Sequence, residues 1–347
     1  MLAYTEEYVS DLAEIRKVIP NLEKVRGKRI LVTGAGGLIG SAIVDFLLQL
    51  NRDMDAQIGI YAGGRSREKM SVRFGNRTKY AGFHFFPYDA MREIDSTLCF
   101  DYVLHAAGIS NTSSYAEEPV EVMLTTLTGM KHMLEYARRG NVGRLVCISS
   151  SEIYGKKDGR EPYREDDYGY IDLLNPRACY PVSKRAAETL CASYDKEYGI
   201  AYVTARPGHV YGPTAAATDR RAVSQFAWDV HSGKDIVMKS AGAQLRSYCY
   251  VLDCVSALVT IMLNGVCGTA YNVSNPCAIV SIRGMAECFA RAAGRRIVFA
   301  EASERERAGY NLMENSALAS ERLEALGWRG LFDMEAGAAR TLHSLTG

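Results

Sequence analysis

The chain has 347 residues, a formal net charge of +1, 48% hydrophobic residues and 23% charged residues. This is the composition of an ordinary globular protein, and the length exceeds that of one average domain. Without a basic excess or a membrane-length apolar run, the sequence argues against a nucleic-acid-binding protein and a membrane protein. An anionic ligand would therefore have to be bound by local groups.

The N-terminal segment and the cysteines favour a cytoplasmic protein. The first 14 residues carry four acidic side chains and lack the apolar run of a signal peptide. The nine cysteines include no Cys-x-x-Cys and no Cys/His group with metal-ligand spacing, so we expect no metal site. Scattered cysteines such as Cys99, Cys147 and Cys254 are typical of reduced thiols.

The hydrophobic pattern predicts strands and helices in alternation. Helical spacing of Val9, Leu12, Ile15 and Ile19 predicts an amphipathic helix from Glu6 to Glu23, with a packing role and no chemistry. Strands are then predicted at 30–32, 58–61, 83–87, 102–104, 145–148 and 201–204, and helices at 41–50, 120–138 and 180–198. Apolar strands separated by helices predict an α/β fold, a doubly wound parallel sheet covered on both faces.

The pattern also suggests three regions. Residues 1–26 form an N-terminal helical extension, residues 27–206 a dinucleotide-binding Rossmann domain, and residues 207–347 a smaller, loop-rich substrate lobe. In such folds ligands bind at the carboxyl ends of the strands, which this lobe would cover. The chain is expected to cross back to the first domain at least once.

A glycine-rich turn connects the first strand of the sheet to the first helix. It reads Thr33-Gly-Ala-Gly-Gly-Leu-Ile-Gly40. Glycines allow a sharp turn and a close approach of the backbone to a pyrophosphate, and the helix N-terminus supplies amide donors. This position in a strand–helix unit predicts a dinucleotide cofactor.

A tyrosine and a lysine, Tyr180 and Lys184, lie one helical turn apart in Tyr-Pro-Val-Ser-Lys. A free phenol, with a pKa near ~10, is a poor base at neutral pH, but a neighbouring ammonium and an oxidised nicotinamide both favour the phenolate. The pair is therefore the candidate catalytic base and its activator.

The glycine spacing, Gly-x-x-Gly-x-x-Gly, and the Tyr-x-x-x-Lys pair resemble the extended short-chain dehydrogenase/reductases of the NAD-dependent epimerase/dehydratase family, from about Arg29 to Ile282. The resemblance implies NAD or NADP as cofactor. Arg65 stands after the second strand, where an acidic residue often holds the ribose of NAD, and would favour NADP by pairing with a 2′-phosphate. The residues that the resemblance assigns to the cofactor are Gly34, Gly36, Gly37, Leu38, Ile39, Gly40, Arg65, Asp89, Ala106, Ala107, Gly108, Tyr180 and Lys184.

Two segments narrow the resemblance to nucleotide-sugar decarboxylases and 4,6-dehydratases. In Ser149-Ser-Ser-Glu-Ile-Tyr154, the resemblance makes Ser150 the catalytic serine and Ser151 a substrate contact, and the following Glu152 could act near carbon five of the sugar. A salt-bridged surface glutamate is the alternative. The segment Pro176-Arg-Ala-Cys-Tyr180 looks most like the decarboxylases and makes Arg177 a substrate-binding candidate.

The C-terminal region resembles the family's nucleotide-sugar lobe, with one departure. In Arg206-Pro-Gly-His-Val-Tyr-Gly-Pro213, His209 stands where the family usually has the asparagine that contacts the substrate diphosphate. A histidine can also donate to a phosphate, so the resemblance makes His209 a substrate-binding candidate. The resemblance assigns Arg221 and Arg246 to the substrate diphosphate, a role that suits planar guanidinium groups. A nucleotide-diphosphate sugar is the expected substrate.

The expected reaction begins with oxidation at carbon four of the sugar, with Tyr180 as base. The ketone then permits decarboxylation or dehydration, which Glu152 and Arg177 favour, or epimerisation at carbon four. A carbonyl reductase and a non-catalytic dinucleotide-binding sensor are further alternatives. The resemblance also implies a homodimer paired through the helices at 120–138 and 180–198.

Overall fold

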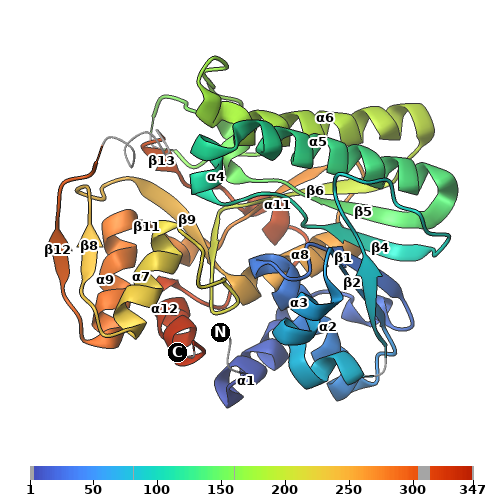
Figure 1. Cartoon of the computed structure of the whole chain (residues 1–347), viewed down its shortest axis with the longest axis horizontal. Helices are drawn as coiled ribbons and strands as arrows, with labels where there is room; N and C mark the ends of the chain where they lie inside the picture. Colours follow the sequence, from blue (N-terminus) through green and yellow to red (C-terminus); the bar gives the residue numbers. More distant parts are fainter. Residues whose placement is uncertain (1–3, 81, 160, 304–312, 346–347) are drawn as a thin grey trace.

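A seven-stranded parallel sheet forms the centre of the computed structural model, which describes residues 4–80, 82–159, 161–303 and 313–345. Its strand order is β10-β6-β5-β4-β1-β2-β3 (Figure 1). The strands are β1 (Arg29–Thr33), β2 (Gly59–Gly64), β3 (Phe83–Pro87), β4 (Phe100–His105), β5 (Val142–Ile148), β6 (Tyr202–Pro207) and β10 (Ala270–Val273). All six neighbouring pairs are parallel, so the doubly wound α/β fold is confirmed.

Helices cover both faces of this sheet (Figure 1). One face carries α5 (Pro119–Tyr136) and α6 (Cys179–Tyr198), and the other carries α2 (Leu38–Met54), α3 (Arg67–Phe74) and α8 (Val251–Asn264). Because side chains alternate along a strand, Leu31 and Val103 belong to the core under α5, whereas Val32 and Leu104 belong to the core under α2 and α8. This burial on both faces explains the continuous apolar runs of the strands.

The N-terminal helix is shorter than predicted. Helix α1 spans Glu6–Glu14, and 3₁₀ turns follow at Ile15–Val18 and Leu22–Val25. The prediction of one helix as far as Glu23 is therefore wrong. Pro20 has no amide hydrogen to donate, and the residue before it, Ile19, adopts extended backbone.

The region after residue 207 has more regular structure than its sequence suggested. Its helices are α7 (Ala222–His231), α8, α9 (Ile282–Ala293), α11 (Glu321–Glu324) and α12 (Met334–His343). Its short strands are β7 (His209–Tyr211), β8 (Ile236–Met238), β9 (Leu245–Tyr250), β11 (Ile279–Ser281), β12 (Ile297–Phe299) and β13 (Asn315–Ser316). Between them, β10 returns to the central sheet beside β6.

Neither a membrane-spanning helix nor a metal-binding cluster is found within the described ranges. No helix there is long and apolar enough to cross a membrane. No group of three His, Cys, Asp or Glu side chains there is placed to hold a metal ion. All nine cysteines are unpaired.

Candidate active site

The glycine turn lies where the sequence predicted it, between β1 and α2. Gly34 adopts a left-handed backbone (φ +66°), and a Cβ there would lie 2.8 Å from the carbonyl oxygen of Ala106. Gly37 caps α2, and its amide donates to the Gly34 carbonyl (2.9 Å). A Cβ at Gly40 would lie 2.3 Å from that same carbonyl. The turn is therefore tight enough that only glycine fits at its two ends.

The loop after β4 packs directly against this turn. The Ala107 amide donates to Oγ1 of Thr33 (3.2 Å), which lies 3.0 Å from Nδ1 of His105. The Thr33 hydroxyl thus contacts both the Ala107 amide and the His105 ring. Burial and the charge of Lys184 lower the pKa of His105 to about 3, so this ring is neutral. Hydrogen bonds thus hold the end of β1, where the glycine turn begins, against the loop after β4.

These loops fit a dinucleotide. The turn exposes glycine backbone at the N-terminus of a 17-residue helix, an arrangement that binds a pyrophosphate. Asp89 is half-buried just beyond β3, and its Oδ1 accepts from the Met91 amide (3.0 Å). Arg65, just beyond β2, is exposed and has no hydrogen bond or ion pair with another described residue.

The candidate base and its activator lie on the first two turns of α6. Tyr180 is 8% exposed, and Nζ of Lys184 lies 5.9 Å from its ring centroid. The ammonium donates to the Ile148 carbonyl at the end of β5 (2.8 Å). It would lie 4.0 Å from a Cβ atom placed on Gly108, in the loop after β4. Lys184 is therefore held between the phenol and the cofactor loops.

Tyr115, in the short helix α4 (Thr112–Glu117), was not predicted from the sequence and lies against the candidate base Tyr180. The two rings stack with centroids 4.6 Å apart and planes 18° apart. The guanidinium carbon of Arg177 also lies over the Tyr115 ring, 4.7 Å from the ring centroid. Burial, with the neighbouring Tyr180 and Glu152, raises the pKa of Tyr115 well above its ordinary value, so Tyr115 stays a neutral phenol. No spacing in the sequence marks this residue.

Glu152 completes this column of side chains. Nη2 of Arg177 donates to Oε1 of Glu152 (3.0 Å), and Nη1 lies 2.9 Å from Oε2. Their side chains are only 12% and 17% exposed, so Glu152 is salt-bridged but is not a surface glutamate. We name the sequence Tyr180–Tyr115–Arg177–Glu152 the aromatic–ionic column.

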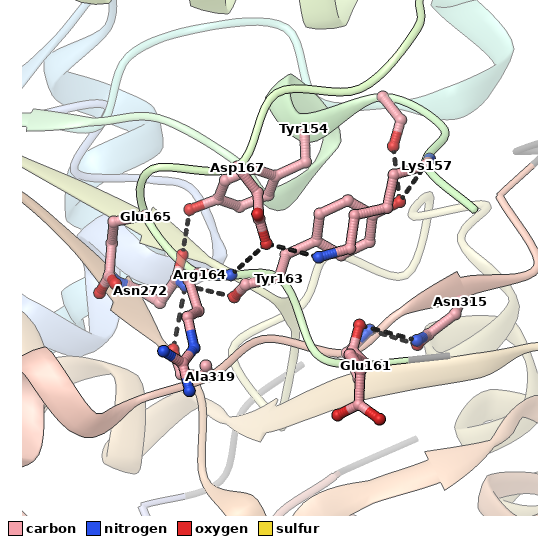
Figure 2. Close-up of polar contacts among 12 residues, drawn as sticks. Tyr154, Lys157, Glu161, Tyr163, Arg164, Glu165, Asp167, Asn272, Asn315 and Ala319 are labelled. Carbon is pink, nitrogen blue, oxygen red and sulfur yellow. Dashed lines mark hydrogen bonds and ion pairs between the residues drawn. The ribbon is translucent and has the colours of Figure 1, made fainter. Parts of the chain in front are cut away.

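The turn that carries Glu152, Ser151–Tyr154, is anchored by buried polar contacts (Figure 2). Ser150 caps it by accepting from the Glu152 amide (3.2 Å), and Ser151 is buried. At the other end, the Tyr154 hydroxyl donates to Oδ1 of Asn272 (2.5 Å), as Figure 2 shows. The Asn272 amide nitrogen Nδ2 in turn donates to the Tyr163 carbonyl (2.9 Å). Glu152 therefore projects from a fixed turn.

The three predicted diphosphate ligands differ in how available they are. Arg246 is 3% exposed and donates only to carbonyls, those of Leu245 and Met313 (2.8 Å each), so its charge has no carboxylate partner among the described residues. By contrast, Arg221 is bonded to Asp219 through both Nε and Nη2 (3.0 and 2.6 Å to Oδ2). A bound anion would have to displace Asp219 from Arg221. It would displace no carboxylate of the described residues from Arg246.

His209 lies beside these arginines on β7. Burial, with the charges of Arg246 and Arg221, lowers the pKa of His209 to about 3. Its Nδ1 is buried without a hydrogen-bond partner among the described residues. A neutral imidazole donates through one nitrogen only, so His209 can make one hydrogen bond to a phosphate oxygen, as an asparagine amide would.

The glycine turn, the Tyr/Lys pair and the sheet occur together in a known family. A model of the NAD dependent epimerase/dehydratase family matches residues 30–274. The chain belongs to this family. It is thus an NAD-dependent enzyme, and of the two cofactors that the sequence left open, NAD is confirmed.

Curated relatives within the NAD dependent epimerase/dehydratase family include UDP-glucuronic acid decarboxylases. Decarboxylase 1 of Xenopus tropicalis is 27% identical over 318 residues, which cover 91% of this chain and 72% of the relative. Decarboxylase 6 of Arabidopsis thaliana is 32% identical over 248 residues, covering 72% and 69%. The match with decarboxylase 1 of Danio rerio covers only 57% of that protein.

Solved structures of the family share the fold. The UDP-glucose 4-epimerase of Thermus thermophilus in complex with NAD has a TM-score of 0.75 at 26% identity, covering 91% of this chain and 98% of that one. The dTDP-glucose 4,6-dehydratase of Streptomyces venezuelae, with NAD bound, has a TM-score of 0.77 at 21% identity, covering 91% and 96%. One architecture thus serves epimerases and dehydratases.

Proposed function

We propose that this enzyme oxidises carbon four of UDP-glucuronate and then decarboxylates the sugar. The observation that carries this proposal is the aromatic–ionic column, because it places a carboxylate-binding guanidinium one stacked ring away from the candidate base. The similarity to UDP-glucuronic acid decarboxylases supports the same substrate.

In the first step, Tyr180 removes the proton of the carbon-four hydroxyl. Lys184 stabilises the phenolate by its positive charge, and Ser150 donates a hydrogen bond to the same sugar oxygen. The glycine turn would hold NAD, which would supply the acceptor for the hydride of carbon four and its donor after decarboxylation. The neutral Tyr115 ring keeps water away from one face of the Tyr180 ring.

In the second step, the ketone makes the substrate a β-keto acid. The bond between carbon five and the carboxylate breaks, carbon dioxide leaves, and the electron pair moves into an enolate that takes a proton at carbon five. Tyr180 then returns its proton to the carbon-four oxygen as the hydride returns to carbon four, which gives the UDP-pentose. A 4,6-dehydratase would instead eliminate the carbon-six hydroxyl, and an epimerase would return the hydride to the other face. Neither of these reactions requires a guanidinium next to carbon six, which is why Arg177 favours decarboxylation.

Substrate diphosphate is the ligand we assign to Arg246, His209 and Arg221. The guanidinium of Arg246 lacks an anionic partner among the described residues and is poorly hydrated, and both features favour a phosphate contact. His209 lies close enough for the charges of both arginines to act on its ring.

We further infer a cytoplasmic homodimer. Nine unpaired cysteines, six of them buried, suit a reducing compartment. On α5, the side chains of Val120 and Leu124 are 60% and 48% exposed, and burial in a subunit interface with α6 would remove them from water.

Product analysis tests the proposed reaction. The purified enzyme is incubated with UDP-glucuronate, UDP-glucose, dTDP-glucose or GDP-mannose, and the products are identified by NMR. We expect only UDP-glucuronate to be consumed, with one carbon dioxide released per UDP-pentose formed. A 4-keto-6-deoxy sugar or a carbon-four epimer as the main product would refute decarboxylation, and no change in any sugar would refute the substrate class.

A further inference from the structure

A carboxylate already occupies the guanidinium fork of Arg177. The two hydrogen-bonding contacts with Glu152, at 2.9 and 3.0 Å, form the bidentate geometry in which arginine binds a carboxylic acid. This pairing is largely withdrawn from water, since the two side chains are 12% and 17% exposed. A sugar carboxylate could reach these donors only by replacing the one that is there.

The fork is built to receive a carboxylate and to keep its orientation. The guanidinium carbon of Arg177 lies 4.7 Å from the centroid of the Tyr115 ring, and the Tyr180 ring stacks on the same tyrosine. Nε of Arg177 is buried and has no partner among the described residues, so one donor remains for a new ligand. Glu152 and Arg177 come from separate turns, Ser151–Tyr154 and Pro176–Ala178, so they can separate without breaking an element.

We propose that the fork of Arg177 is the receptor for the sugar carboxylate, and that Glu152 occupies it until the substrate arrives. This inference rests on the proposed function, because it requires a uronic acid as substrate. When the sugar carboxylate binds Arg177, the displaced carboxylate of Glu152 takes up one proton from solvent. The exchange is balanced: one carboxylate replaces another on the guanidinium, and the proton neutralises the one displaced.

The surroundings of Glu152 explain the proton uptake. The groups that face it from neighbouring elements are Arg177, Tyr115 on α4, Cys179 on α6 and Arg246 on β9. With Arg177 engaged by the substrate, Arg246 is the one cation among these groups that could neutralise Glu152, and its Nη atoms already donate to carbonyls. A second carboxylate close by in a poorly hydrated site favours the protonated form.

Binding measurements on variants that do not turn over test this exchange. All proteins carry Tyr180→Phe, and calorimetry gives the affinities for UDP-glucuronate, UDP-glucose and UDP between pH 6 and 8. We expect the dissociation constant for UDP-glucuronate to rise by up to tenfold per pH unit, since one proton is taken up. Glu152→Gln should remove this pH dependence, tighten UDP-glucuronate at least tenfold at pH 8, and leave UDP-glucose and UDP unchanged.

Arg177→Lys and a matched glutamate variant serve as comparisons. Arg177→Lys keeps the charge but loses the fork, and should weaken UDP-glucuronate at least tenfold without changing UDP. Glu135→Gln makes the same amide change in an arginine-paired glutamate on α5, outside the site, and should change nothing. Unfolding curves show whether each variant is folded.

Two results would overturn the exchange. One is that Glu152→Gln weakens the binding of UDP-glucuronate. The other is that the protein with Glu152 intact shows a dissociation constant for UDP-glucuronate that does not depend on pH. If the otherwise unmodified enzyme still releases carbon dioxide, either result refutes the exchange alone. If it releases none and binds UDP-glucuronate no better than UDP-glucose, the proposed function itself fails.

Discussion

Gly34 and Gly27 share a left-handed backbone but differ in their surroundings. Their φ angles are +66° and +67°, yet a Cβ at Gly34 would contact the backbone of Ala106 and Ala107, whereas nothing lies within 4 Å of one at Gly27. Gly27→Ala should therefore cost only the backbone strain, about 1–2 kcal/mol of unfolding free energy, with unchanged NAD affinity. Gly34→Ala should also force apart the two cofactor loops and weaken NAD at least tenfold.

Equilibrium titration of NAD, with urea unfolding of the same samples, separates these effects. Equal NAD affinities for Gly34→Ala and Gly27→Ala would show that the contact between the loops does not shape the cofactor site.

His209 makes the stability of the enzyme depend on pH in the acid range. Its folded-state pKa of about 3 lies below the unfolded value of 6.5, so the folded state disfavours the proton. The stability from neutral His209 is fully present above pH 6.5 and is lost as the pH falls toward 3. In His209→Asn, the unfolding free energy should fall less steeply between pH 6.5 and 4.5, by about 1.4 kcal/mol per pH unit.

Urea unfolding at several pH values measures that slope, with His84→Asn, at an exposed histidine, as the comparison. A slope unchanged by His209→Asn would mean that the ring titrates normally and is not enclosed as described.

At the scale of elements, the sequence predicted the central strands better than the short ones. The inner strands β1, β4, β5 and β6 are largely buried, and their apolar runs were visible. The edge strand β3 is partly exposed, yet it matches the predicted residues 83–87. Three-residue strands such as β7 and β8 are too short to show a period, and their pairing depends on residues distant in the chain. Pro20 was a visible stop signal in the first helix.

The site divides in a similar way. The glycine turn and Tyr180/Lys184 are local patterns, so spacing alone located them. Tyr115 joins the site only because α4 folds over α6, a contact that no local signal carries. The pairing of Glu152 with Arg177 likewise links residues 25 apart.

The N-terminal helix is attached to the sheet layer through a buried carboxylate. Asp45 on α2 is fully buried and accepts from the hydroxyls of Tyr4 (2.7 Å) and Tyr8 (3.2 Å) and from Nη2 of Arg73 (2.7 Å). Asp45→Asn would leave Arg73 without its anionic partner, and removing one partner of a buried pair typically costs about 3–5 kcal/mol. We expect such a loss in urea unfolding.

The exposed pair of Arg283 and Glu287 provides the comparison, and Glu287→Gln should cost less than about 1 kcal/mol. Similar losses for Glu287→Gln and Asp45→Asn would show that the Asp45 cluster adds no more than a surface pair.

At the scale of the whole molecule, contacts between distant segments tie the N-terminal part of the chain to the region after residue 207. Helix α1 pairs with the C-terminal helix through Asp11 and Arg340 (2.9 Å). The hydroxyl of Thr214 in the lobe donates to the Leu38 carbonyl at the start of α2 (2.8 Å). The second contact ties the region after residue 207 directly to the helix that the glycine turn precedes.

We infer that the Tyr180 phenol, beside Lys184, starts a reaction in which the sugar carboxylate is lost as carbon dioxide. The most direct measurement is carbon dioxide release from UDP-glucuronate labelled in its carboxylate, by the enzyme and by Tyr180→Phe. We expect steady release by the enzyme and at least a thousandfold slower release by the variant, because the phenyl ring cannot accept the proton. Full turnover by Tyr180→Phe would show that the Tyr180 phenol is not the base.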